Sequence, residues 1–195
     1  MNQETKRSAR ASYRPGALGE ATVEKADGRF TLVFVRELEH SPEKVWRALT
    51  APNELREWAP FDADRDLGKT GPATLAMAGG PEPVLSPSNV SAVDPPRLLE
   101  YTWENDVLRW ELAPSGAGTR LTLRHTLADR TFVPKIAAGW QICLDVAERA
   151  LDGAPIGRIV AMEALEFGWE HLNDEYAKRF GIANTGVPKR ETIGR

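Results

Sequence analysis

Three histidines and a single cysteine are the residues of this sequence with the greatest potential for catalysis or metal binding. The histidines, His40, His125 and His171, lie far apart, and none has a histidine partner at the spacing of a helical zinc site. Cys143 falls on the apolar face of a predicted helix, where a packed core thiol is favoured over a nucleophile. The sequence therefore predicts neither a metal site nor a cofactor.

His125 and Arg36 are polar residues on predicted apolar faces. His125 lies between Leu123 and Leu127 on the inward face of a strand, where desolvation favours the neutral ring. A core histidine bonded to one partner is favoured, and a ligand contact is the alternative. Arg36 shares a face with Phe34, and we expect it to snorkel or to pair with an acid rather than to anchor a ligand.

Aromatic residues could form either a packed core or an apolar pocket with a few polar handles. Two of them, Trp46 and Trp58, lie in two predicted short helices. The first begins at Pro42 after the N-cap Ser41, and the second begins at Pro52. The full set is Trp46, Trp58, Tyr101, Trp103, Trp110 and Trp140. Both interpretations remain open at this point.

Composition excludes several classes of protein. The 195 residues are 42% hydrophobic and 27% charged, which is typical of a soluble domain. A net charge of −3 argues against a dedicated nucleic-acid binder, and no apolar run approaches the roughly 20 residues of a membrane span. A lone cysteine excludes an intramolecular disulfide, so a cytoplasmic location is the default. The "GKT" at 68–70 lacks the first glycine of a phosphate-binding loop, and no G-x-S-x-G is present.

The spacing of apolar residues predicts the order of the elements. Asp27-Gly28 separates two runs of strand-forming residues and indicates a hairpin. The predicted elements are that hairpin over 21–38, two short helices from Pro42 and from Pro52 to Trp58, strands near 73–78, 84–93, 97–104, 108–112 and 121–127, and helices over 134–151 and 157–180. This order predicts an α+β fold in which a curved antiparallel sheet wraps around the long helix 134–151.

The predicted domain is a single unit over 19–181, with a flexible tail at 1–18 and a polar tail at 182–195. The extra helix over 157–180 carries a continuous apolar stripe that must be buried. It could fold back on its own domain, which is slightly favoured. Alternatively, Trp169, Leu172 and Tyr176 could meet their copies across a two-fold homodimer interface.

Several segments carry a resemblance to a known superfamily. They are "VRELEHSPEKVWRALTAPNELREW", "VDPPRLLEYTW" (93–103), "LRWEL" (108–112), "GTRLTLRHTL" (118–127) and "GWQICLD" (139–145), which together span about 25 to 151. Their order resembles the START-like (SRPBCC) superfamily with its helix-grip fold. The most similar branch is the bacterial one related to the heat-shock protein 90 ATPase activator, also described as polyketide-cyclase-like.

The resemblance implies a cavity between the sheet and the long helix. The residues expected to line it are Trp46, Trp58, Tyr101, Trp103, Trp110, His125, Trp140 and Cys143. Non-covalent binding of a small hydrophobic or aromatic molecule is favoured, because no pair of titratable groups has the spacing of an acid–base couple. The alternative is a cyclase or aromatase that uses His125, Tyr101 and Arg36. A chaperone-interaction module ranks third, because we expect the chain to lack the second domain of the eukaryotic activator.

Overall fold

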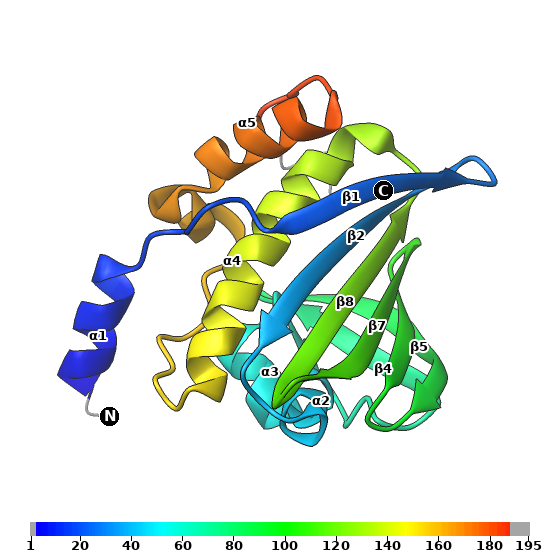
Figure 1. Ribbon diagram of the computed structural model, residues 1–195, viewed down its shortest axis with the longest axis vertical. Helices are drawn as coiled ribbons and strands as arrows, with labels where there is room; N and C mark the ends of the chain where they lie inside the picture. Colours follow the sequence, from blue (N-terminus) through cyan, green and yellow to red (C-terminus); the bar gives the residue numbers. More distant parts are fainter. Residues whose placement is uncertain (1–2, 188–195) are drawn as a thin grey trace.

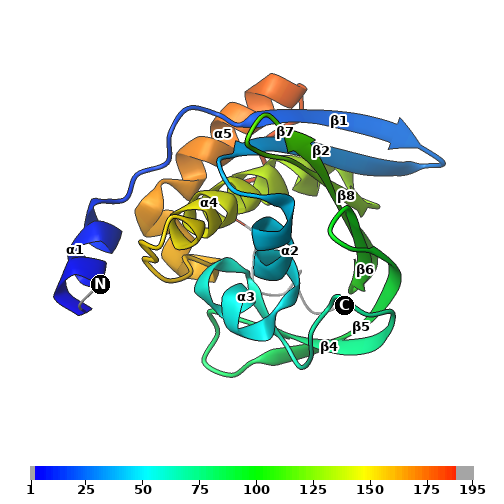
Figure 2. The same cartoon turned by 60° about the horizontal axis from the view of Figure 1, so that its bottom comes forward.

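The computed structural model describes residues 3–187, and its framework is an eight-stranded antiparallel sheet that curves around a long helix (Figures 1 and 2). The strands are β1 (Glu20–Ala26), β2 (Arg29–Leu38), β3 (Phe61–Ala63), β4 (Gly71–Met77), β5 (Val84–Asp94), β6 (Leu98–Trp103), β7 (Asp106–Ser115) and β8 (Gly118–Leu127). Their spatial order is β1-β2-β8-β7-β6-β5-β4-β3, so β1 and β3 are the two edges. The predicted α+β helix-grip fold is confirmed.

The hairpin between β1 and β2 turns at Asp27 and Gly28, as the sequence predicts. Both residues have positive φ angles, 50° and 76°. That conformation is the one a two-residue hairpin turn needs, and asparagine, aspartate and glycine tolerate it best. The turn sets the register of β1 on β2, with Val23 opposite Leu32 and Lys25 opposite Phe30.

The meander β6-β7-β8 places its apolar residues on the concave face of the sheet. Trp110 lies opposite Leu99 on one side and Leu123 on the other, and Leu108 lies opposite His125. Because side chains alternate along a strand, the residues between them project from the opposite face. Ion pairs bridge neighbouring strands there, such as that between Arg109 of β7 and Glu100 of β6 at 3.2 Å.

Helices α2 (Pro42–Thr50), α3 (Pro52–Trp58) and α4 (Val133–Leu151) cover the concave face, and α4 runs along it (Figure 2). The Ser41 side chain accepts a hydrogen bond from the Lys44 amide, which confirms the predicted cap. A 3₁₀ turn, η1 (Arg130–Phe132), leads from β8 into α4.

The predicted helix over 157–180 is wrong in its first half. The chain instead forms a 3₁₀ segment, η2 (Ala161–Phe167), and then helix α5 (Trp169–Phe180). Gly168 separates them with a φ of 87°, a left-handed conformation that interrupts a helix.

Helix α5 packs on α4 of its own chain (Figure 1). Trp169, Leu172 and Tyr176 are 8%, 2% and 0% exposed, and the Tyr176 hydroxyl donates to Gln141 Oε1 at 2.5 Å. The first alternative for this stripe is therefore correct. The homodimer interface through these residues is wrong, because their side chains are already buried within the single chain.

The N-terminal segment differs from the flexible tail expected at 1–18. Helix α1 (Gln3–Ser12) forms there. Tyr13, which follows it, is only 2% exposed, and its hydroxyl donates to Asp145 on α4 at 2.7 Å. Of the polar tail at 182–195, Ile182 is 7% exposed and contacts the core. Residues 1–2 and 188–195 lie outside the described part. Within residues 3–187, no helix is both long and apolar enough to cross a bilayer.

Candidate functional site: a packed aromatic interior and a groove beside β1

Four tryptophans meet between the sheet and α4. The Trp140 ring centre lies 5.3 Å from that of Trp110 and 5.9 Å from that of Trp103, with the ring planes close to perpendicular. Trp58 from α3 meets Trp110 at 6.0 Å in the same edge-to-face arrangement. This is the geometry that aromatic pairs adopt in packed cores.

The indole N–H groups of this cluster all have partners inside the protein. Trp110 donates to the Tyr101 hydroxyl at 3.1 Å, Trp58 to the Ala48 carbonyl at 3.0 Å and Trp103 to the Met77 sulfur at 3.2 Å. Burial raises the pKa of the Tyr101 hydroxyl, which holds it neutral. The polar atoms are therefore used to secure the packing, since a buried donor left without a partner is costly.

His125 is held from both sides. Trp140 donates its indole N–H to Nδ1 at 2.9 Å, and Nε2 lies 2.9 Å from Asp106 Oδ2. An indole nitrogen can only donate, so Nδ1 carries no proton and Nε2 donates to the carboxylate. His125 is 2% exposed. The predicted core histidine is correct, with two partners where one was expected.

Sequence reasoning missed Asp106 and Phe61 as members of this cluster. The Phe61 ring lies 5.6 Å from Trp103 and 6.2 Å from Tyr101. Asp106 had a usable signal, because it precedes Leu108 and Trp110 by two and four residues and so shares their face of β7. Phe61 had none, because its three-residue strand is too short for an alternation pattern.

Three of the predicted site residues lie apart from the cluster's ring contacts. Arg36 pairs with Asp145 at 2.6 Å, as expected of an arginine among apolar neighbours. Trp46 is only partly buried, and its indole nitrogen lies beside Gly68. Cys143 is 4% exposed on α4, and burial raises the pKa of its thiol to about 12.

Cys143 is expected to resist alkylation in the native protein. The thiolate is the reactive form, so iodoacetamide at about pH 8 should leave the folded protein unmodified for hours. Unfolding in urea should make the same thiol fully reactive, and because the chain has one cysteine, the added mass reports on this site alone. Rapid alkylation of the native protein would show that the α4 interior is open to solvent.

The interior between sheet and α4 is closely packed around the four tryptophans. The hollow found beside Trp58 and Leu144 has a volume of about 10 Å³, roughly the room that one water molecule needs. Apart from Trp46, the aromatic residues predicted to line a cavity are instead in contact with one another. Within residues 3–187, no three His, Cys, Asp or Glu side chains are grouped as metal ligands.

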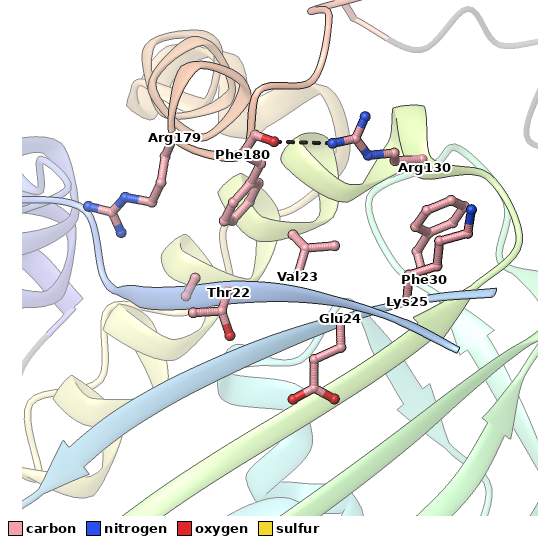
Figure 3. A pocket seen from close by; sticks show the side chains of 9 residues that line it. Thr22, Val23, Glu24, Lys25, Phe30, Arg130, Arg179 and Phe180 are labelled. Carbon is pink, nitrogen blue, oxygen red and sulfur yellow. Dashed lines mark hydrogen bonds between the residues drawn. The ribbon is translucent and has the colours of Figure 1, made fainter. Parts of the chain in front are cut away.

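A larger hollow lies outside this interior, between β1 and the end of α5. It is a groove of about 610 Å³ lined by Ala21, Thr22, Val23, Glu24, Lys25, Phe30, Arg130, Arg179 and Phe180 (Figure 3). In Figure 3, Val23 and Phe180 face each other across it, whereas Thr22 and Glu24 project from the opposite side of β1. None of these residues was singled out as a site by the sequence, because β1 and α5 lie near opposite ends of the chain.

A curved antiparallel sheet closed by a long helix defines a protein of the helix-grip class. The model of the family described as activator of Hsp90 ATPase homolog 1-like protein matches residues 39–152, more than half of the chain, so this protein belongs to that family. No curated protein sequence matches the chain.

Solved structures with the same fold come from several bacteria. A conserved protein of unknown function from Enterococcus faecalis is 17% identical at a TM-score of 0.65, covering 91% of this chain and 95% of that one. CalU16 from Micromonospora echinospora is 19% identical at a TM-score of 0.61, and the match covers 82% of this chain and 96% of that one. A Mesorhizobium loti protein is 28% identical at a TM-score of 0.55, and the match covers 63% of this chain and 97% of that one. The first two similarities establish the fold alone.

Proposed function

We propose that this protein binds a small hydrophobic or aromatic molecule without covalent chemistry, and that the ligand occupies the groove between β1 and α5. The observation that carries the proposal is the groove itself: its volume of about 610 Å³ lies within the range of small-molecule sites. The filled sheet–helix interior, in contrast, offers a ligand only about 10 Å³ beside Trp58.

The surfaces that a ligand would contact are apolar side chains held by regular structure. Val23 and Ala21 come from one face of β1, Phe30 from β2 and Phe180 from the last turn of α5. The Phe180 ring stacks on Tyr176 at 5.5 Å, and Tyr176 is bonded to Gln141 of α4. An aromatic ligand could therefore extend an existing stack at little ordering cost.

The aromatic cluster has a structural role in this proposal. Trp58, Tyr101, Trp103, Trp110 and Trp140 support the sheet on α4 and do not meet the ligand. The residues considered for a cyclase or aromatase are equally engaged: both His125 nitrogens are hydrogen-bonded, and Arg36 pairs with Asp145 in another part of the interior. The third group, the Tyr101 hydroxyl, is buried in the core, where it accepts a hydrogen bond from Trp110 and burial raises its pKa. A non-enzymatic binder is favoured over these chemistries because two of the groups are engaged and the third lies inside the packed interior.

A neutral fluorescent dye tests the proposal. N-phenylnaphthylamine should bind saturably with enhanced emission, and the Val23→Trp variant, which fills the groove, should weaken its affinity at least roughly tenfold. Thr22→Trp is the matched control, because the same bulk on the adjacent residue projects from the other side of β1 (Figure 3). Wild-type affinity in Val23→Trp, or an equal loss in both variants, would place the site elsewhere.

A further inference from the structure

Three cations line the apolar groove and have no acidic partner in the described part of the chain. Lys25, Arg130 and Arg179 line it, and none of the ion pairs within residues 3–187 includes any of them. Their contacts are with neutral groups. Arg130 donates to the Phe180 carbonyl at 3.3 Å and Arg179 to the Gly19 carbonyl at 2.5 Å, while the Lys25 ammonium lies 5.5 Å from the centre of the Phe30 ring.

The one acid among the lining residues does not balance this charge. Glu24 projects from the opposite side of β1 (Figure 3), where its carboxylate accepts a hydrogen bond from Arg124 of β8 at 2.9 Å. The groove thus combines an apolar floor with a rim of positive charge. The protein as a whole has a net charge of −3, so the positive charge of this groove is opposite in sign to that of the whole chain.

We propose that the ligand of this groove is a small apolar molecule that carries a single anionic head group. The inference rests on the proposed function and adds the charge of the ligand to it. The apolar body lies against Val23, Phe30 and Phe180, and the head group is held by Lys25 and Arg130. A guanidinium and an ammonium both donate to an anionic oxygen without losing an existing ion pair.

The form of the groove favours a free small molecule over a membrane or an acidic peptide. A volume of about 610 Å³ suits one compact ligand, and the residues that line the groove come from β1, β2, η1 and α5. Three isolated cations are fewer than the cluster of basic residues that an anionic lipid surface requires. The predicted ligand is therefore bound as a single molecule from solution.

Two dyes of one skeleton separate the apolar contribution from the charged one. Anilinonaphthalene sulfonate has the ring system of N-phenylnaphthylamine plus one sulfonate. We expect the anionic dye to bind about fivefold to tenfold more tightly, as a few exposed charge contacts allow. The double variant Lys25→Gln/Arg130→Gln should bring the ratio of the two affinities near one. Salt at about 1 M should do the same, because it shortens the screening length to about 3 Å.

The control is Arg97→Gln, which removes the same kind of charge from an exposed pair with Asp94 far from the groove. It should leave the ratio unchanged. If neither dye binds, the proposed function fails and this inference with it. If the neutral dye binds and the anionic one binds no more tightly, or if the ratio survives in the double variant, the proposed function stands and the anionic ligand is wrong. Co-sedimentation with phosphatidylglycerol vesicles at similar affinity would also overturn it.

Discussion

Trp110→Ala is expected to lower the free energy of unfolding by about 3–5 kcal/mol, the range measured when a buried tryptophan or phenylalanine is truncated. Trp110 is 1% exposed and lies between Trp58 and Trp140, with its indole N–H bonded to Tyr101. Alanine would leave a cavity among rigid aromatic rings and an unpaired Tyr101 hydroxyl. Urea unfolding followed by circular dichroism measures the loss.

The matched control is Trp46→Ala, because Trp46 is only partly buried and lies outside the cluster. This substitution should lower the free energy of unfolding by clearly less, roughly 1–2 kcal/mol. The comparison decides whether the interior is core or pocket. If Trp110→Ala costs less than about 1 kcal/mol while it abolishes dye binding, Trp110 lines an open ligand site and the account of a filled interior is wrong.

The second large effect is expected from Asp145→Ala, which should lower the free energy of unfolding by about 3 kcal/mol, because it removes the nearer acidic partner of a largely buried arginine. Only the more distant Glu148, at 3.7 Å, would remain to balance the charge of Arg36. The Arg36 and Asp145 side chains are 19% and 13% exposed and lie 2.6 Å apart. Asp145 also accepts a hydrogen bond from Tyr13, so the variant releases the anchor of the N-terminal segment as well.

Asp94→Ala provides the comparison for this ion pair. Asp94 meets Arg97 at 2.8 Å, but their side chains are 49% and 69% exposed, and such pairs contribute about 0–1 kcal/mol. Hydrogen exchange should additionally show faster exchange over α1 and Tyr13 in Asp145→Ala only. Equal stability of the two variants would mean that water solvates the interior around Arg36.

The fold could be predicted from the sequence wherever one short-range pattern determined the structure. Asp27-Gly28 specifies its turn by backbone conformation alone, and the alternation in Leu108, Trp110 and Leu112 specifies which face of the sheet is buried. The proline at position 42 similarly marks the start of α2. Each of these signals lies within a few residues of the feature it predicts.

The remaining features depend on contacts between distant segments. Helix α1 has no buried residue of its own, so its sequence carries no apolar stripe that would predict a helix. It is held by Arg10, which donates hydrogen bonds to the carbonyls of Ile156 and Gly157. Prediction of the groove would have required the position of Phe180 relative to Val23. That position is set by the packing of α5 on α4. The number of aromatic residues was readable from the sequence, but whether they left space between them depended on their side-chain packing.

The most direct test of the account is an NMR titration of the protein with N-phenylnaphthylamine, following backbone amides and the indole N–H signals together. If the ligand binds in the groove, we expect shifts in residues 21–25, Arg130 and Phe180. The indole signals of Trp58, Trp110 and Trp140 should stay unchanged. These indoles are hydrogen-bonded inside the packed interior, away from the groove. Shifts concentrated in the three indoles, with residues 21–25 unaffected, would contradict it and place the ligand between the sheet and α4.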